Sequence, residues 1–211
     1  MENIITSRPI LMCAPMVCGI LDDRKEKTRR TVKDSVIGPS IQELKPIDKD
    51  ILRSMCPYGQ PGDLLWVREN CWAHKDTGEI FAYCATDTKL YRDNKSVKVV
   101  PSIHMPRKKC RILLEITSTD IQRLQDISEA DCLAEGIVRE RFIIGADCAG
   151  GHHREIMGDR YFTCDPDIDG DEGFADAYAA FRALWISLNG LDSWNANPWV
   201  WVIGFNRVAL S

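Results

Sequence analysis

The chain has 211 residues, of which 45% are hydrophobic and 27% charged, and its formal net charge is -4. This is the composition of a globular protein long enough to bury a core, and it excludes an intrinsically disordered chain. No apolar run is long enough to span a bilayer, and the N-terminal "MENIITSRPI" lacks the features of a secretory signal, so we expect a cytoplasmic protein with no membrane partner.

The nine cysteines are scattered through apolar runs and include no C-x-x-C. Their odd number argues against a complete disulfide framework. We therefore expect reduced thiols that pack mainly in the core.

The first part of the chain predicts a strand, a short helix and a strongly basic segment. "PILMC" (residues 9–13) is strand-like, and "APMVCGILDD" (residues 14–23) is typical of a helix that ends at the acidic pair. The basic segment follows at once, with five cationic side chains between residues 24 and 30 of a chain that is acidic as a whole. Residues 34–61 mix prolines, glycines and charges, which predicts a long surface connection with a single helical turn.

Two strand signals follow, and a turn-prone segment precedes the second. "GDLLWVRE" (residues 62–69) is a turn followed by a strand, and "EIFAYCAT" (residues 79–86) begins as the turn-prone "KDTGE" (residues 75–79) ends. We predict that these two strands pair as a hairpin.

The second half of the chain mixes strands and helices without regular alternation. "CRILLEIT" (residues 110–117) alternates as a strand, and "SEADCLAEG" (residues 128–136) has capping-box spacing at its start and a glycine at its end. Residues 174–189 carry an aromatic stripe at helical spacing, and "NPWVWVIGF" (residues 197–205) is a closing strand. This order predicts an α+β fold built on a small barrel rather than a doubly wound sheet.

Seven motifs together resemble the ASCH domain family of the PUA-like superfamily, and in particular ASCH proteins of phages and prophages. They cover almost the whole chain in order and read "RPILMCAPM", "DRKEKTRR", "GDLLWVRE", "SIHMPR", "LQDISEADCLAEGI", "FRALWISLNG" and "NPWVWVIGF". The resemblance implies a single domain over residues 1–211: a small mixed β-barrel flanked by helices, with two loop insertions at about 34–61 and 140–173. The chain departs from the family pattern at Asp23, where the family usually has glycine.

The family is linked to RNA binding, and one bacterial branch hydrolyses the acetyl amide of N4-acetylcytidine. In that branch a Lys-x-x-Thr pair and a downstream glutamate are catalytic. The resemblance assigns these roles to Lys25, Thr28 and Glu135.

The residue types of the Lys-x-x-Thr motif allow the same chemistry. A threonine hydroxyl is a poor nucleophile and needs a neighbouring base. Lys25 can be that base only if its pKa falls, and the surrounding cations would lower it by like-charge repulsion. The alternatives are that "RKEKTRR" is a solvated basic turn or a phosphate-binding patch without chemistry.

Glu135 is unusual in its place. It lies in the last turn of the predicted helix before Gly136, where a carboxylate opposes the helix dipole at a cost of about 0.3–1 kcal/mol. A locally unfavourable residue is expected where function requires it, and Glu135 would suit a proton donor to a leaving amine. The alternative is an exposed glutamate in an ordinary salt bridge.

Further residues are candidates for substrate binding: Arg29, Arg30, Trp66, Arg68, Glu69, His104 and Arg107. An aromatic plate beside a guanidinium and a carboxylate in "WVRE" suits the stacking and edge-reading of a base. The alternatives are a core Trp66 with a structural Arg68–Glu69 pair, and a solvated loop around His104 and Arg107.

Two clusters have some character of metal sites. The Cys148, His152, His153 and Cys164 cluster matches no common zinc-finger spacing. "DPDIDGDEGFAD" (residues 165–176) fits calcium-loop spacing better, but Glu172 replaces the usual apolar residue and Asp176 is equally a helix cap. We predict neither a metal nor another cofactor.

These observations together predict a protein directed at a modified nucleoside or RNA. The first expectation is an amidohydrolase that removes an acyl group from a base such as N4-acetylcytidine. The alternatives are a non-catalytic RNA- or nucleotide-binding module and a ribonuclease.

Overall fold

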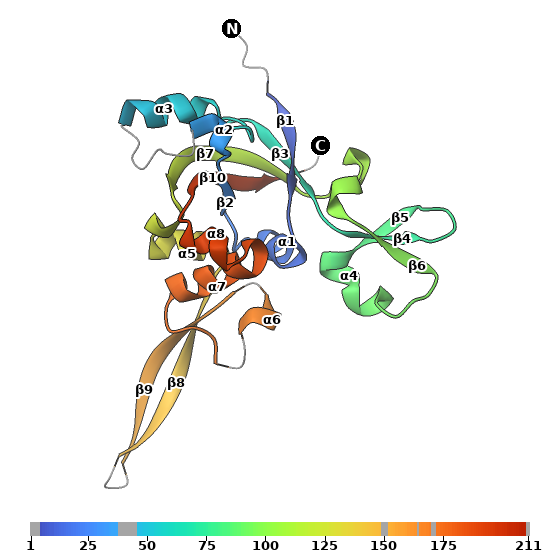
Figure 1. The fold of residues 1–211 in the computed structure, drawn as a ribbon. Coiled ribbons are helices and arrows are strands. Elements are labelled where there is room, and N and C mark those ends of the chain that lie inside the picture. The colour runs from blue at the N-terminus through green and yellow to red at the C-terminus, as the bar shows by residue number, and fades with distance from the viewer. Residues whose placement is uncertain (1–4, 38–45, 149–151, 164, 170–171, 210–211) are drawn as a thin grey trace.

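The computed structural model describes residues 5–37, 46–148, 152–163, 165–169 and 172–209. Within these residues the strands form three sheets, with helices packed around them (Figure 1). One sheet has five strands in the order β1-β3-β7-β10-β2, a second has three in the order β5-β4-β6, and β8 pairs only with β9. The fold is therefore mixed α+β, as the sequence predicted.

The five-stranded sheet carries the candidate site. It contains β1 (Ser7–Leu11), β3 (Leu64–Arg68), β7 (Leu113–Arg123), β10 (Trp199–Val208) and β2 (Lys27–Thr31). β1 is parallel to β3, and the other neighbours are antiparallel. The backbone ladder ends at β1 on one side and β2 on the other, so these strands form an open sheet and not the closed barrel that was expected.

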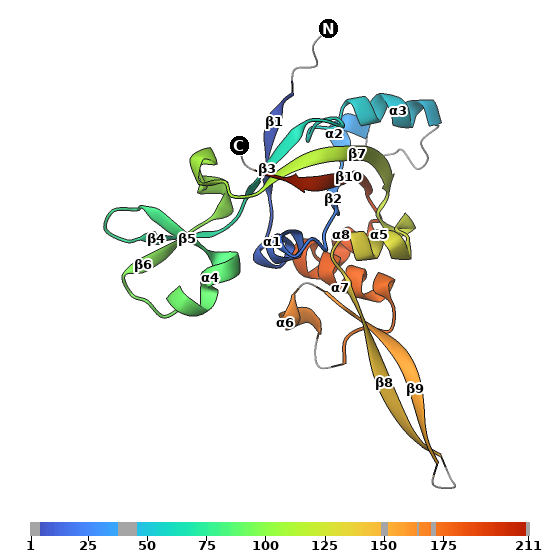
Figure 2. The ribbon, with the colours of Figure 1, turned by 180° about the vertical axis from the view of Figure 1, so that it is seen from behind.

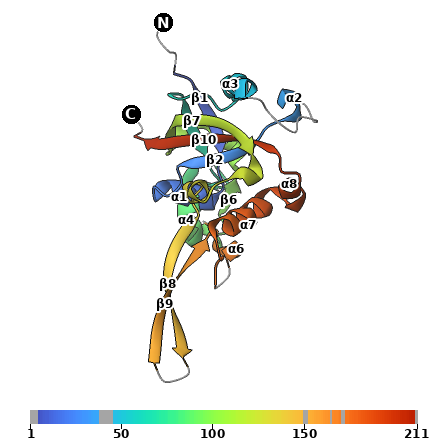
Figure 3. The same ribbon diagram turned by 90° about the vertical axis from the view of Figure 1, so that its left-hand side faces the viewer.

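Strand β10 is buried on both faces. Trp199, Trp201 and Ile203 belong to the core shared with α1 (Ala14–Leu21), whereas Val200 and Val202 belong to a second core. The second core contains residues of α7 (Ala177–Asn189) and α8 (Leu191–Asn195), which lie together at one side of the sheet (Figure 3). A strand covered on both sides fixes the positions of its two neighbours, β7 and β2.

Capping side chains set the start of two predicted helices. Ser128 accepts a hydrogen bond from the Asp131 amide at 3.1 Å and begins α5 (Glu129–Ala134), and Gly136 has φ 102° just beyond its end. Asp176 accepts from the Ala179 amide at 2.7 Å, which places the start of α7 at residue 177 rather than 174. Both predicted helices are confirmed.

A small lobe holds the three-stranded sheet of β4 (Cys71–His74), β5 (Ile80–Tyr83) and β6 (Val97–Val100), with α4 (Cys84–Tyr91) beside it. The predicted hairpin between residues 62–69 and 79–86 is wrong, because β5 pairs with β4 and β3 pairs with β1 and β7. The short strand "CWAH" (β4) lies between the two predicted strands in the sequence, and β5 pairs with it instead of with β3.

The two predicted loop insertions contain regular structure. Residues 34–61 include α2 (Asp34–Ile37) and α3 (Pro46–Ser54). Residues 140–173 include most of β8 (Val138–Cys148), then β9 (His152–Phe162) and α6 (Pro166–Asp169). β8 and β9 project from the body of the molecule as an arm, away from the small lobe (Figure 2). No described helix is long and apolar enough to cross a membrane.

Short 3-10 helices link the main elements: η1 (Ser102–His104), η2 (Arg107–Lys109) and η3 (Leu124–Asp126). The described cysteines are free thiols, and Cys71 and Cys132 are fully buried. Burial raises the pKa of each of these two thiols to about 12. Both therefore pack as apolar groups, as the sequence predicted.

The turn after α1 keeps a glycine-like backbone although Asp23 occupies it. Asp23 has φ 54°, in the left-handed region, and its amide donates to the Ile20 carbonyl at 3.2 Å. Its carboxylate contacts the Arg207 guanidinium at 3.1 Å. Asp23 thus forms this turn without a glycine, at a backbone cost of about 1 kcal/mol.

Replacing Asp23 by valine should lower the free energy of unfolding by about 1–2 kcal/mol relative to Asp23→Gly, because a β-branched residue is strained at positive φ. Both variants lose the Arg207 contact, so the difference between them measures the backbone strain at position 23 alone. Urea unfolding gives the difference, and Asp22→Val, at φ -86°, is the control. Equal unfolding midpoints for the valine and glycine variants would contradict strain at Asp23.

Candidate functional site

The segment that carries Lys25 is fixed from three directions by backbone hydrogen bonds. The Lys25 amide donates to the Gly19 carbonyl of α1 at 3.0 Å, and the Glu26 amide donates to the Ala134 carbonyl of α5 at 2.8 Å. The Glu26 carbonyl accepts from the Phe205 amide of β10 at 2.9 Å. These bonds hold α1, α5 and β10 around one short stretch of chain.

Two glycines leave room for the Lys25 side chain. A Cβ added at Gly19 would lie 3.3 Å from the Lys25 Cβ, and one added at Gly136 would lie 3.4 Å from the same atom. The lysine chain therefore passes between α1 and the end of α5, where a larger residue on either side would crowd it.

The Lys25 ammonium meets Glu135 across 110 residues of sequence. Its Nζ donates to Glu135 Oε2 at 2.7 Å and to the Glu135 carbonyl at 2.9 Å. The Lys25 side chain is 0% exposed and that of Glu135 is 4% exposed. The cation also offsets the unfavourable placement of a carboxylate at the end of α5, because it lies where the helix dipole favours positive charge.

Arg29 and Lys27 extend this pair into a charge cluster. Arg29 Nη1 contacts Glu135 Oε1 at 3.1 Å, and Arg29 Nη2 contacts Asp131 Oδ2 at 2.8 Å. Lys27 Nζ contacts Asp131 Oδ1 at 2.5 Å. Burial disfavours ionisation of Asp131, but Lys27 and Arg29 outweigh it and hold the pKa of this carboxyl below its ordinary value.

The cations of residues 24–30 are thus either buried or half-buried. Lys25 and Arg29 are buried, and the solvated basic turn is therefore wrong as an interpretation of this segment. Arg24, which is half-buried, pairs with the neighbouring Asp22 at 2.8 Å. The charge that Lys25 contacts is the Glu135 carboxylate, in addition to the neighbouring cations that the sequence analysis considered.

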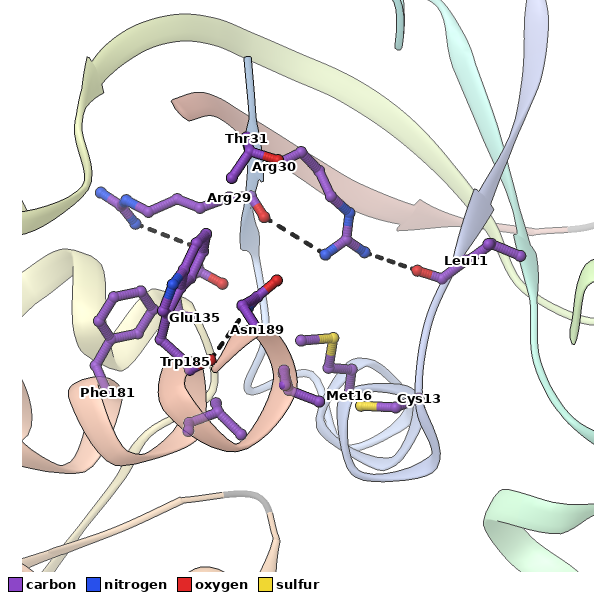
Figure 4. Close-up of a pocket in the computed structure, with 12 residues that line it drawn as sticks. Leu11, Cys13, Met16, Arg29, Arg30, Thr31, Glu135, Phe181, Trp185 and Asn189 are labelled. Carbon is purple, nitrogen blue, oxygen red and sulfur yellow. Dashed lines mark hydrogen bonds and ion pairs between the residues drawn. The ribbon is translucent and has the colours of Figure 1, made fainter. Parts of the chain in front are cut away.

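A cavity of about 220 Å³ opens beside this cluster (Figure 4). Strand β2 and Glu135 supply its charged wall, and α7 supplies an aromatic and aliphatic wall opposite. The start of α1 closes a third side. Its lining residues are Leu11, Cys13, Met16, Arg29, Arg30, Thr31, Glu135, Phe181, Leu184, Trp185, Leu188 and Asn189.

Strand alternation sends Thr28 and Arg30 to the face of β2 opposite Arg29. Thr28 pairs with Ile203 and Arg30 with Trp201, both in the core under α1, whereas Arg29 pairs with Val202 in the second core. The Thr28 side chain is 0% exposed and its hydroxyl has no hydrogen-bond partner. Thr28 and Lys25 are not among the residues that line the cavity, but Glu135 and Arg30 are.

Arg30 also joins the two edges of the open sheet. Its Nη2 donates to the Leu11 carbonyl at the end of β1, 2.7 Å away, and contacts Met12 Sδ at 3.3 Å. Its Nη1 donates to the carbonyl of Arg29 at 3.4 Å. Figure 4 shows this guanidinium reaching from β2 toward β1.

The remaining predicted binding residues do not line this cavity. The Arg68 and Arg107 guanidinium carbons lie 5.3 and 5.8 Å from the centre of the half-buried Trp66 ring, in a separate group. His104 lines a different, more open cavity of about 510 Å³. The structure therefore separates Trp66, Arg68, His104 and Arg107 from Lys25 and Glu135.

Glu69 is buried, and its partner is Arg111. Arg111 donates to both Glu69 carboxylate oxygens at 2.8 Å and lies 4.0 Å from the Tyr83 ring centre. The structural Arg68–Glu69 pair considered from the sequence is therefore not what holds Glu69. Its carboxylate ties the end of β3 to the segment before β7 and is not part of the cavity lining.

The sequence missed the aromatic wall of the cavity as a functional surface. Phe181 and Trp185 were expected as core residues of a helical stripe, and they are indeed buried. Asn189, at the end of the same helix, donates to the Trp185 carbonyl at 3.1 Å and also lines the cavity. The motif "FRALWISLNG" contained the only signal, because it places these residues on one helical face.

The structure describes only part of the two clusters that were considered as metal sites and not adopted. Cys164, Gly170 and the side chains of Cys148, His152 and His153 lie outside the part of the chain that the structure describes. Asp176 serves as the cap of α7 and Asp169 Oδ1 accepts from the Thr163 amide at 2.6 Å. Among the described residues, no group of three or more His, Cys, Asp or Glu side chains could hold a metal ion.

Comparison with known proteins gives no match to a family model, to a curated protein or to a solved structure.

Removing one member of the buried pair should destabilise the protein strongly. Glu135→Leu leaves Lys25 and Arg29 without this carboxylate, and we expect a loss of about 3–5 kcal/mol in the free energy of unfolding. Adding Lys25→Met to Glu135→Leu should restore about 1 kcal/mol or more. Urea unfolding of both single variants and the double variant measures the coupling, and strictly additive losses would contradict it.

The lowered pKa of Asp131 predicts acid sensitivity. A carboxyl whose pKa is depressed on folding adds stability above its unfolded pKa of about 3.9, and this contribution is lost as pH falls through the folded pKa. The Asp131→Asn variant should therefore lose less stability than the wild type between about pH 5 and pH 3. Urea unfolding across this range tests it, with exposed Asp93→Asn as the control expected to behave like the wild type.

Proposed function

We propose that the protein is an amidohydrolase of the PUA-like ASCH type that removes an acyl group from the exocyclic amine of a modified base such as N4-acetylcytidine in the cytoplasm. The observation that carries the proposal is the buried Lys25–Glu135 contact at the wall of a cavity. The resemblance named these two residues together with Thr28, although more than a hundred residues separate them. A proton-transfer pair beside a ligand-sized cavity is what such a reaction requires.

The cavity suits a planar ring with polar edges. Phe181 and Trp185 offer an aromatic and apolar surface on one side, as nucleobases require for stacking. Glu135, Arg29 and Asn189 place acceptors and donors on the other sides. The volume of about 220 Å³ fits one base and its acyl group better than a folded polymer.

The proposed chemistry uses the proton shared by Lys25 and Glu135. Transfer of this proton along the 2.7 Å hydrogen bond turns the ammonium–carboxylate pair into an amine and a carboxylic acid. The Lys25 amine then accepts the Thr28 proton as the hydroxyl oxygen bonds to the amide carbon. Glu135 gives its proton to the leaving amine as the C–N bond breaks, and water hydrolyses the resulting threonine ester.

In this reaction the acyl group must reach Thr28 past Arg30. Both residues lie on one face of β2, and Arg30 lines the cavity while Thr28 does not. The buried hydroxyl without a partner supports a role for Thr28, because leaving a hydroxyl unsatisfied costs about 1–3 kcal/mol and calls for an explanation.

The second candidate is a nucleotide-binding module without chemistry. It is favoured by the same fact that Thr28 lies outside the cavity lining, and by the engagement of the Lys25 ammonium with two oxygens of Glu135. Such a module would use the charged and aromatic walls for binding alone. The two candidates differ in whether an acyl group is released.

The Thr28→Val substitution separates them. Valine has nearly the shape of threonine and lacks the hydroxyl, which has no partner to lose, so the free energy of unfolding should stay the same or rise. We expect turnover of N4-acetylcytidine to cytidine by the wild type, at least about a hundredfold loss in Thr28→Val, and partial recovery in Thr28→Ser. Chromatography of the products measures turnover.

Binding of the unreacted nucleoside to Thr28→Val, followed by calorimetry, serves as the control for an intact cavity. A wild-type protein that binds N4-acetylcytidine but leaves it and other N4-acylated cytosines intact would establish the binding module instead. Unchanged turnover in Thr28→Val would remove Thr28 from the mechanism.

A further inference from the structure

Positive charge exceeds negative charge at the cavity. Lys25, Lys27 and Arg29 share the two carboxylates Asp131 and Glu135, and a fourth cationic side chain, Arg30, lines the cavity. Lys25 is matched by Glu135 and Lys27 by Asp131, while Arg29 divides its contacts between the same two carboxylates. Four positive charges thus face two negative charges, which leaves an excess of two positive charges. Of the four cationic side chains, Arg29 and Arg30 line the cavity.

Arg30 carries the clearest part of this excess. In the described part of the chain it contacts the Leu11 and Arg29 carbonyls and the Met12 sulfur, all of them neutral. A half-buried guanidinium usually has a carboxylate or phosphate as its partner, because burial makes an unbalanced charge costly. Among the residues that the structure describes, the carboxylate that lines the cavity is Glu135, and it already accepts from Lys25 and Arg29.

We infer that the cavity takes a ligand with an anionic group, and that this group is a phosphate held by Arg30. A guanidinium presents several parallel N–H donors that match phosphate oxygens, and such charge-assisted bonds are stronger than neutral ones. This inference rests on the proposed function for the nucleobase part of the ligand. It names the substrate as a nucleotide, free or in a strand, rather than a neutral nucleoside.

The position of Arg30 agrees with this role. It approaches the cavity from β2, while Phe181 and Trp185 form the opposite wall on α7, so one ligand can touch an aromatic surface and a guanidinium together (Figure 4). The bond of Arg30 to the Leu11 carbonyl holds the guanidinium at the cavity. A purely structural link between β1 and β2 would need that bond but would not need an excess of charge.

Calorimetric titration of the full chain with unacylated ligands tests the inference without any turnover. The probes are cytidine, cytidine 5′-monophosphate, inorganic phosphate and a short oligocytidylate RNA. We expect the monophosphate to bind at least about tenfold more tightly than cytidine, with an affinity that falls as salt rises. Tighter binding of the oligonucleotide than of the monophosphate would identify the phosphates of a strand as the source of the anion.

Arg30→Gln keeps hydrogen-bond donors and removes the charge. It should bring the ratio of monophosphate to cytidine affinity close to one, and Arg30→Lys should keep part of the preference. Arg24→Gln is the matched control, because it also removes a cation from the basic segment of residues 24–30. Arg24 pairs with Asp22 and does not line the cavity. Its affinity ratio should equal that of the wild type.

Equal wild-type affinities for cytidine and its monophosphate would overturn the inference. An Arg30→Gln variant that weakens both ligands by the same factor would do so too, since that is the signature of a structural role. A protein that prefers the monophosphate yet hydrolyses no acylated cytosine would lose the proposed activity and keep this anion site. Turnover of acylated cytosine with no preference for the monophosphate would support the proposed activity and rule out the anion site.

Discussion

The contact between the Lys25 ammonium and the Glu135 carboxylate is the interaction on which the geometry of the site depends. A buried charge is tolerated only when its partner lies in the right place, so this pair fixes the end of α5 against the turn that follows α1. Gly19 and Gly136 provide the space, and the backbone bonds of Glu26 to Ala134 and Phe205 provide the alignment. The cavity then lies where these elements meet β2 and α7.

Strand β2 distributes four of its polar side chains between two environments. Lys27 and Arg29 face the carboxylates of α5, whereas Thr28 and Arg30 face the core under α1. The period of two residues along a strand therefore divides one basic sequence motif into a part that contacts carboxylates and a part, with Arg30, that contacts neutral groups. A single-residue shift in the pairing of β2 with β10 would exchange these two roles.

Local patterns in the sequence were enough to predict the α+β class, the helices that begin at Ser128 and Asp176, and the closing strand. Pairing was harder to predict, because the four-residue strand "CWAH" is too short to give a clear signal and competes with β3 for β5. Neither the open edge of the sheet at β2 nor the arm of β8 and β9 follows from local pattern. Both depend on contacts between distant residues.

The same reasoning applies to the site. The motif pointed to Lys25 and Glu135 and to Arg29 as a substrate-binding residue, but the contacts of Arg29 with Asp131 and Glu135 are visible only in the packed chain. Trp66 and Arg68 have the residue types of a base-binding surface and lie elsewhere. Residue type is visible in a sequence, whereas the sharing of a cavity by α7 and β2 is a property of the packed chain.

The central place of β10 in the sheet has a consequence for how the chain folds during synthesis. β2 hydrogen-bonds only to β10 among the described strands, yet the ribosome makes β10 some 170 residues later. Until then β2 has no strand to pair with, and its buried Arg29 lacks its final surroundings. Pairing of such distant segments is slow because a long loop must close first. The charge cluster should consequently form in one of the last steps, after α5 has emerged and as β10 enters the sheet.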